Sequence, residues 1–207
     1  MRSFEEGIYH IGSHGSDDRF LFLTDRDRED FLDRLSATLE RFALELHCYA
    51  LLGNHYHTLL RIPDARVSVA LQRLHTEYAR HHNRRHGRRA HLFRAHPFAR
   101  AIESDGDLAY TCRYIVRNPV EAGLVDDPLK WCWSSARAHA GLEPARIPLV
   151  EESLRHAFAG PGNWRERFRR YVQDANDKQP ETLGLPKKRQ DPSAARAPDG
   201  ALRIFRR

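Results

Sequence analysis

The residues best suited to chemistry in this sequence are two histidines, His55 and His57. They lie in residues 46–62, LHCYALLGNHYHTLLRI, where two apolar runs flank the step Gly53-Asn54. A Gly-Asn step closes a tight β-hairpin, so both histidines are predicted on its second strand. Side chains two residues apart on a strand point to the same face. The two imidazoles are therefore expected side by side, near enough to bind one metal ion.

The simplest register of this hairpin places Ala50 opposite His57 and Leu52 opposite His55, with Cys48 further along the same face. The small Ala50 side chain would leave room for an ion. An H-x-H pair is by itself a weak motif, because many such pairs are unrelated surface or core histidines. A metal hydrolase of another kind, with Cys48 as a further ligand, stays open at this point. The opposite face of the second strand suits a core, with Tyr56, Thr58, Leu60 and Ile62.

A helical segment further along the chain offers a tyrosine and an amide at a useful spacing. Tyr114 and Asn118 are four residues apart and share a helix face. If that face covers the histidine pair, Asn118 becomes a third metal ligand and Tyr114 stands beside the ion. Imidazole and oxygen ligands suit Mg²⁺ or Mn²⁺ better than a closed zinc site. The alternatives are that Tyr114 only packs, or that Tyr110, one turn earlier, is the reactive residue.

The composition is that of a basic globular protein. The chain has 207 residues, enough for one domain and an appendage, and 34 Lys and Arg against 28 Asp and Glu give a net charge of +6. A basic balance points weakly to nucleic acid. No apolar run approaches the ~20 residues that span a bilayer, and MRSFEEGIYH lacks the apolar centre of a signal peptide. With three scattered cysteines, a cytoplasmic, nucleoid-associated protein is expected.

The elements that must position these side chains follow from periodicity and caps. Thr24 and the acids after it predict a helix start, Gly87 a helix end, and Pro119 a helix end at Asn118. The predicted order is strand, helix, hairpin, helix, strand and helix, over residues 7–14, 24–42, 46–62, 67–86, 98–104 and 105–118. This predicts an α+β sandwich of ferredoxin-like or RRM-like type, with helices packed on one face of an antiparallel sheet. The other face is then free for a site.

The domain organisation is predicted from shifts in composition. Residues 1–143 form the domain that carries the candidate site, closed by the aromatic segment 131–141. Residues 144–175 suggest a small, basic helical appendage. Residues 176–207 are rich in Pro, Lys, Arg and Asp, and we expect a basic, disordered tail there.

Positive charge gathers on the predicted helix 67–86 and just after it. A solvated face is the usual fate of such charges, but the run is almost entirely positive, which favours contact with a phosphate backbone. The residues expected to contact nucleic acid are Arg73, Arg80, Arg84, Arg85, Arg88, Arg89, Arg94 and Arg117.

Two motifs together carry a family resemblance. The segments GNHYHTLL and RYIVRNPVEAGLV resemble the paired signature of HUH single-strand transposases with one catalytic tyrosine, in particular the REP-associated tyrosine transposases. NRRHGRRAHLFR, WCWSSARAHAG and WRERFRRYV match supporting segments, so the resemblance covers residues 7–174. It implies that His55, His57 and Asn118 hold a divalent ion, Mg²⁺ or Mn²⁺, and that Tyr114 is the nucleophile.

The resemblance also implies a reaction. A single-stranded DNA endonuclease and strand transferase of this kind cleaves at or near a hairpin of a repetitive extragenic palindrome through a 5′-phosphotyrosine intermediate, as a monomer or homodimer. Two departures stand out: Gly53 replaces the usual proline, and residues 94–100 lack the usual lysine, for which Arg100 or His96 could substitute. The alternative is therefore a domesticated, catalytically weak protein that binds DNA or RNA hairpins.

Overall fold

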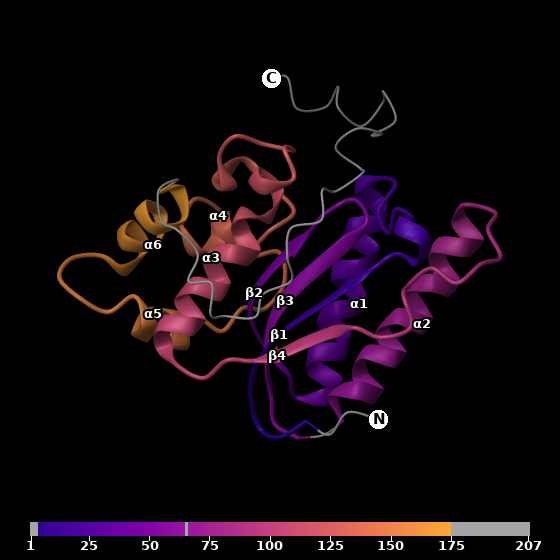
Figure 1. Cartoon of the computed structure of the whole chain (residues 1–207), viewed down its shortest axis with the longest axis horizontal. Coiled ribbons are helices and arrows are strands. Elements are labelled where there is room, and N and C mark those ends of the chain that lie inside the picture. The colour runs from indigo at the N-terminus through magenta and orange to yellow at the C-terminus, as the bar shows by residue number, and fades with distance from the viewer. Residues whose placement is uncertain (1–3, 65, 175–207) are drawn as a thin grey trace.

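The centre of the protein is a four-stranded antiparallel sheet in the order β2-β3-β1-β4. The computed structural model describes residues 4–64 and 66–174 (Figure 1). The strands are β1 (Gly7–His14), β2 (Glu45–Leu51), β3 (His55–Ile62) and β4 (Phe98–Ala101). With the helices between them, the strands follow the β-α-β-β-α-β order of ferredoxin-like folds. The predicted fold class is confirmed.

Two long helices cover one face of the sheet. They are α1 (Asp25–Phe42) and α2 (Val67–Arg85). Thr24 caps α1 as predicted, in a reciprocal capping box with Asp27. The apolar stripes of both helices bury against Tyr56, Leu60 and Ile62 of β3, which form the core expected on that face.

A third long helix, α3 (Asp105–Glu121), packs against the opposite face, so that face is not left free as expected (Figure 1). Its Leu108, Cys112 and Ile115 share a core with Cys48 and Leu59 of the hairpin. The reason is that α3 has an apolar stripe of its own, which the uncovered sheet face can bury. Short helices follow: η2 (Pro128–Lys130), α4 (Ala136–His139), α5 (Glu152–Ala157) and α6 (Trp164–Gln173), with η1 (Ser16–Asp18) earlier in the chain.

The predicted end of the third helix at Asn118 is wrong, because α3 runs through Pro119 to Glu121. Proline removes only its own N–H donor, and the ladder resumes beyond it, with Ala122 N donating to Asn118 O at 2.9 Å. Pro119 is buried, so packing outweighs the local bias against helix before proline. Tyr114 and Asn118 consequently lie in regular helix. Two smaller boundaries also differ: β4 ends at Ala101, and His86 caps α2 just before Gly87 at φ 62°.

The C-terminal helices share their core with α3. Leu154, Phe168 and Val172 are fully buried in the same cluster as Cys112. The boundary predicted at residue 143 stays a prediction, and the predicted tail at 176–207 lies outside the described residues. Among the described residues, no helix has the length and apolar character needed to cross a membrane.

Candidate active site

The hairpin sets the histidine pair as its register predicts. Ala50 pairs with His57, and Leu52 N donates to His55 O at 2.9 Å. The two imidazole rings are 5.1 Å apart between centroids and nearly perpendicular. Cys48 is fully buried under α3 within the apolar core, so it does not join the histidines and a site with Cys48 as ligand is not supported.

Two neighbours orient the pair. His55 Nδ1 lies 2.7 Å from Asn54 Oδ1, and His57 Nδ1 lies 3.0 Å from His10 Nε2. Because the Asn54 oxygen can only accept, His55 Nδ1 is the donor and its Nε2 carries the lone pair in the neutral ring. The contact with His10 engages Nδ1 of His57, and where His57 is the donor its Nε2 carries the lone pair that an ion would use. Such partners fix the tautomer and orientation of a ligand histidine.

The helix α3 brings Tyr114 and Asn118 over this pair, as predicted. Asn118 Oδ1 lies 3.3 Å from His55 Nε2. The Tyr114 ring centroid is 5.7 Å from that of His57 and 5.6 Å from that of His10. The two acceptor atoms of His55 and Asn118 converge, which favours a cation between them, so the donor set fits a divalent ion. Tyr110, the alternative tyrosine, is only 5% exposed.

A glycine makes room for the His57 ring. Gly12 pairs with His57 across β1 and β3. A Cβ atom at position 12 would lie 2.8 Å from His57 Nδ1 and 2.9 Å from Tyr56 O, closer than real side chains allow. Glycine is therefore required for the ring of His57 to lie over β1 and reach His10.

Burial sets the protonation of the site. It lowers the pKa of His57 well below its ordinary value, helped by the charges of His10, His55 and His14. It also lowers the pKa of His10 to about 3, helped by Arg100 and opposed by Asp107. Both rings are thus neutral near pH 7, so His57 can offer a lone pair to a metal. Burial raises the pKa of Tyr114, against a hydrogen bond from Asn118, so the phenol keeps its proton.

Four site residues were missed from the sequence: His10, Gly12, His14 and Asn54. His10, Gly12 and His14 alternate along β1, and His14 stacks on His55 with centroids 4.6 Å apart. The alternation HIGSH was the available signal, because residues two apart on a strand share a face. Which strand pairs with the hairpin was not evident locally.

The expected substitute for the missing lysine is engaged elsewhere. Arg100 donates to both oxygens of Asp107, each at 2.8 Å, and to Thr111 Oγ1 at 2.6 Å. It lies opposite His10 in the β1–β4 ladder. Arg100 therefore supports α3 at the edge of the site, and His96 is exposed on the preceding segment.

The predicted nucleic-acid residues fall into two groups. Arg73, Arg80, Arg84, Arg88 and Arg89 are exposed on α2 or just after it, although Arg73 also pairs with Glu77 at 2.7 Å on the helix surface. The other three are held by internal partners: Arg85 by Asp27 at 2.7 Å, Arg94 by Asp18 at 2.6 Å and Arg117 by Val172 O at 2.8 Å. Arg117 lies on α3, apart from the rest, and its side chain is 11% exposed, which does not favour a DNA contact.

Comparison with known proteins agrees with the resemblance in the motifs. No protein-family model matches the chain. A curated protein of Haemophilus influenzae, whose name assigns it to the REP-associated tyrosine transposases, is 27% identical over 140 residues, which cover 62% of this chain and 79% of that protein. The resemblance to the REP-associated tyrosine transposases is confirmed.

A solved structure supports the same conclusion for the fold. It is the structure of a REP-associated tyrosine transposase bound to a REP hairpin, with a TM-score of 0.59 at 18% identity. The match covers 70% of this chain and 86% of that one. This chain and the solved transposase therefore share an overall fold.

Proposed function

We propose that this protein is a metal-dependent single-stranded DNA endonuclease and strand transferase that acts on hairpin-forming repeat DNA. The observation that carries the proposal is the convergence of Tyr114 and Asn118 of α3 with His55 and His57 of β3, two segments far apart in the sequence. A hairpin of a repetitive extragenic palindrome is the proposed substrate, since the solved transposase of the same fold is bound to one.

The proposed chemistry is a transesterification at phosphorus. The Tyr114 oxygen forms a bond to the phosphorus as the bond to the 3′ oxygen breaks. The phenolic proton passes to solvent, and the 3′ oxygen takes up a proton from solvent and departs as a hydroxyl group. The DNA stays attached through its 5′ phosphate to the tyrosine until a 3′ hydroxyl reverses the reaction and transfers the strand. Burial keeps the phenol protonated, and a protonated phenol is a weak nucleophile. Its reactivity therefore has to come from its position beside the phosphate.

The surrounding residues position the participants. His55, His57 and Asn118 are the proposed ligands of Mg²⁺ or Mn²⁺. When bound, the ion would polarise the phosphodiester and offset the negative charge that develops in the transition state. His10 and Asn54 hold the two imidazoles in the tautomers that direct Nε2 towards that ligand position. Gly12 keeps the space that His57 needs.

The deciding experiment follows covalent attachment. The full chain is incubated with Mn²⁺ and an oligonucleotide hairpin with single-stranded flanks, and the denatured protein–DNA adduct is separated by size. We expect the adduct with the wild type and with Tyr110→Phe, the matched control. We expect none with Tyr114→Phe or with EDTA, while hairpin binding by Tyr114→Phe stays close to wild type. An adduct formed by Tyr114→Phe contradicts the proposal.

A second candidate function is a hairpin-binding protein with weak or no cleavage. It is favoured by one observation: where the family's usual lysine is missing, Arg100 is bound to Asp107 and Thr111. In the same assay this function predicts a hairpin complex in the absence of any adduct from the wild-type chain.

A further inference from the structure

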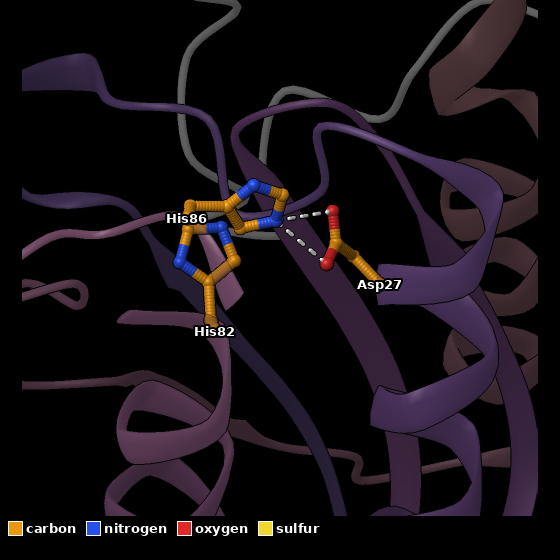
Figure 2. Close-up of side chains that lie close together, drawn as sticks. All are labelled: Asp27, His82 and His86. Atoms are coloured by element: carbon orange, nitrogen blue, oxygen red, sulfur yellow. Dashed lines mark hydrogen bonds and ion pairs between the residues drawn. The ribbon is translucent and has the colours of Figure 1, made fainter. Parts of the chain in front are cut away.

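A second histidine cluster lies between α1 and α2, away from Tyr114 on the other face of the sheet. It consists of Asp27, His82 and His86, whose donor atoms all lie within 4.8 Å of one another (Figure 2). Asp27 is in the first turn of α1, His82 is in the last turn of α2, and His86 caps α2. His82 and His86 are four residues apart, so they share one side of the helix.

The buried imidazole of His82 is the unusual feature of this cluster. His82 is 0% exposed, and neither ring nitrogen makes a hydrogen bond of ordinary geometry among the described residues, although the Asn83 side chain acts weakly on the ring. Leaving such a group unpaired is costly, so each instance calls for an explanation. Burial lowers the pKa of His82 to about 4, which leaves the ring neutral with a lone pair near pH 7. Its ring centroid is 4.5 Å from that of His86.

The carboxylate of Asp27 is fixed and ionised. Its side chain is 0% exposed, and Oδ2 accepts from Leu23 N at 3.1 Å and Thr24 N at 2.9 Å. His86 Nε2 lies 3.0 Å from Oδ1 and 3.1 Å from Oδ2 (Figure 2). Burial alone would raise the pKa of Asp27, but hydrogen bonds from His86, Arg85 and Thr24 outweigh it and lower the pKa to about 2.

We propose that Asp27, His82 and His86 form a binding site for a transition-metal dication of the zinc type. Two imidazoles and one carboxylate are a ligand set that zinc accepts, with water completing a tetrahedron. Zn–N and Zn–O bonds of about 2.0–2.2 Å require donor separations of about 3.4 Å, so a small closure of the present arrangement suffices. The site is independent of the proposed nuclease function, since it shares no residue with Tyr114 and the His55–His57 pair.

Arg85 is the competitor for this site. Its Nη1 donates to Asp27 Oδ1 at 2.7 Å, so an ion must displace it. The Arg85 side chain is 23% exposed, and its guanidinium can turn outward to solvent. Ion binding would thus exchange one cation at Asp27 for another. It would also release Arg85 to the basic end of α2, beside the exposed Arg84 and Arg88.

Zinc binding to the full chain tests the proposal. The background is His55→Ala/His57→Ala, which removes the other histidine pair, and Zn²⁺ is titrated by calorimetry. We expect one bound ion. Adding His86→Gln should weaken binding by at least about tenfold, as even loss of an outer-shell partner weakens metal sites by about 10–100-fold. The exposed His156→Gln is the matched control and should bind like its background. Zinc a hundredfold above Kd should also raise Tm by about 5–10 °C.

Two further variants keep the test decisive if one protein misfolds. His82→Asn replaces the buried ring with a smaller polar group, and Arg85→Gln removes the competing cation while keeping all three ligands. We expect His82→Asn to lose binding and Arg85→Gln to bind zinc more tightly. Absence of zinc binding in the folded background, or equal affinity in the background and in His86→Gln, overturns the proposal.

Discussion

The two faces of the sheet carry two histidine clusters, one with neutral partners and one with charged partners. On the face covered by α3, His55 and His57 are bonded to neutral groups, an amide oxygen and another imidazole. On the face covered by α1 and α2, His86 is bonded to the ionised carboxylate of Asp27, which Arg85 also contacts. The first cluster therefore contains no charged group among these partners, whereas the second contains a carboxylate that Arg85 and His86 contact.

This difference decides what each cluster can do. Neutral ligands beside a tyrosine leave an ion with most of its charge and open positions, which suits binding and polarising a phosphodiester. The carboxylate of Asp27 lies between two helix ends and joins them, through Arg85 and His86 or through the proposed zinc ion. The first arrangement suits chemistry and the second suits stability, and the following predictions test that division.

The largest effect is expected from His57→Ala in the first cluster. It removes a proposed ligand and a neighbour of Tyr114, so the rate of adduct formation on the hairpin substrate should fall by at least about a thousandfold, near the loss seen when an essential catalytic group is deleted. The fold should survive, as judged by circular dichroism. Removal of the ion with EDTA should give the same loss, reversed by added Mn²⁺.

The contrast with the second cluster supplies the control. His86→Gln should lower Tm and leave the adduct rate within about threefold of wild type, because His86 lies across the sheet from Tyr114. Equal losses in adduct rate from His57→Ala and His86→Gln would remove the distinction between the two clusters.

A smaller effect is expected from Gly12→Ala. The new methyl group would lie 2.8 Å from His57 Nδ1 and 2.9 Å from Tyr56 O, so the His57 ring must shift and lose His10. A displaced ligand should reduce the adduct rate and the Mn²⁺ affinity about 10–100-fold. Gly7→Ala on the same strand is the control, since its Cβ meets Tyr9 at an ordinary 3.5 Å. Matching rates for the two alanine variants would show that the close contact at Gly12 is not required.

Local signals were enough to predict much of the fold and part of the first site. The Gly-Asn turn and the period-2 pattern gave the register of Ala50 and His57, and the Thr24 cap gave the start of α1. The spacing of Tyr114 and Asn118 gave their shared helix face. Each of these depends on residues within a few positions of one another.

What could not be predicted depends on contacts between distant segments. His10 reaches His57 across 47 positions, and Asp27 reaches His86 across 59. No local pattern states which strand pairs with the hairpin, or that α1 and α2 meet at these ends. The helix continues through Pro119 because its buried ring outweighs a local bias, which is again a tertiary effect.

The second cluster should show itself in stability towards acid. The pKa of Asp27 is lowered to about 2 from an ordinary 3.8, so its contribution is present above about pH 4 and is lost as pH falls towards 2. The shift corresponds to about 2 kcal/mol of unfolding free energy. Urea unfolding of Asp27→Asn should show a loss of this size at pH 7 and a flatter decline between pH 4 and pH 2.

An exposed ion pair provides the comparison for Asp27. Asp126 is 77% exposed and lies 2.7 Å from Lys130 in solvent. Asp126→Asn should leave the unfolding free energy unchanged at either pH, because exposed pairs contribute little. A pH dependence that is identical in Asp27→Asn and wild type would show that the carboxylate at position 27 does not stabilise the junction of α1 and α2.

The smallest effects are expected at the exposed arginines beyond the second cluster. Arg88→Ala or Arg89→Ala should weaken hairpin binding several-fold and reduce the slope of log K against log salt by about 0.7–0.9, the share of one phosphate contact. Fluorescence anisotropy between 50 and 200 mM salt measures both quantities. Arg117→Ala should leave the salt slope unchanged and lower Tm, because Arg117 donates to Val172 O and joins α3 to α6. A reduced salt slope in Arg117→Ala would show that Arg117 also contacts the phosphate backbone, and the basic end of α2 would then be only part of the nucleic-acid surface.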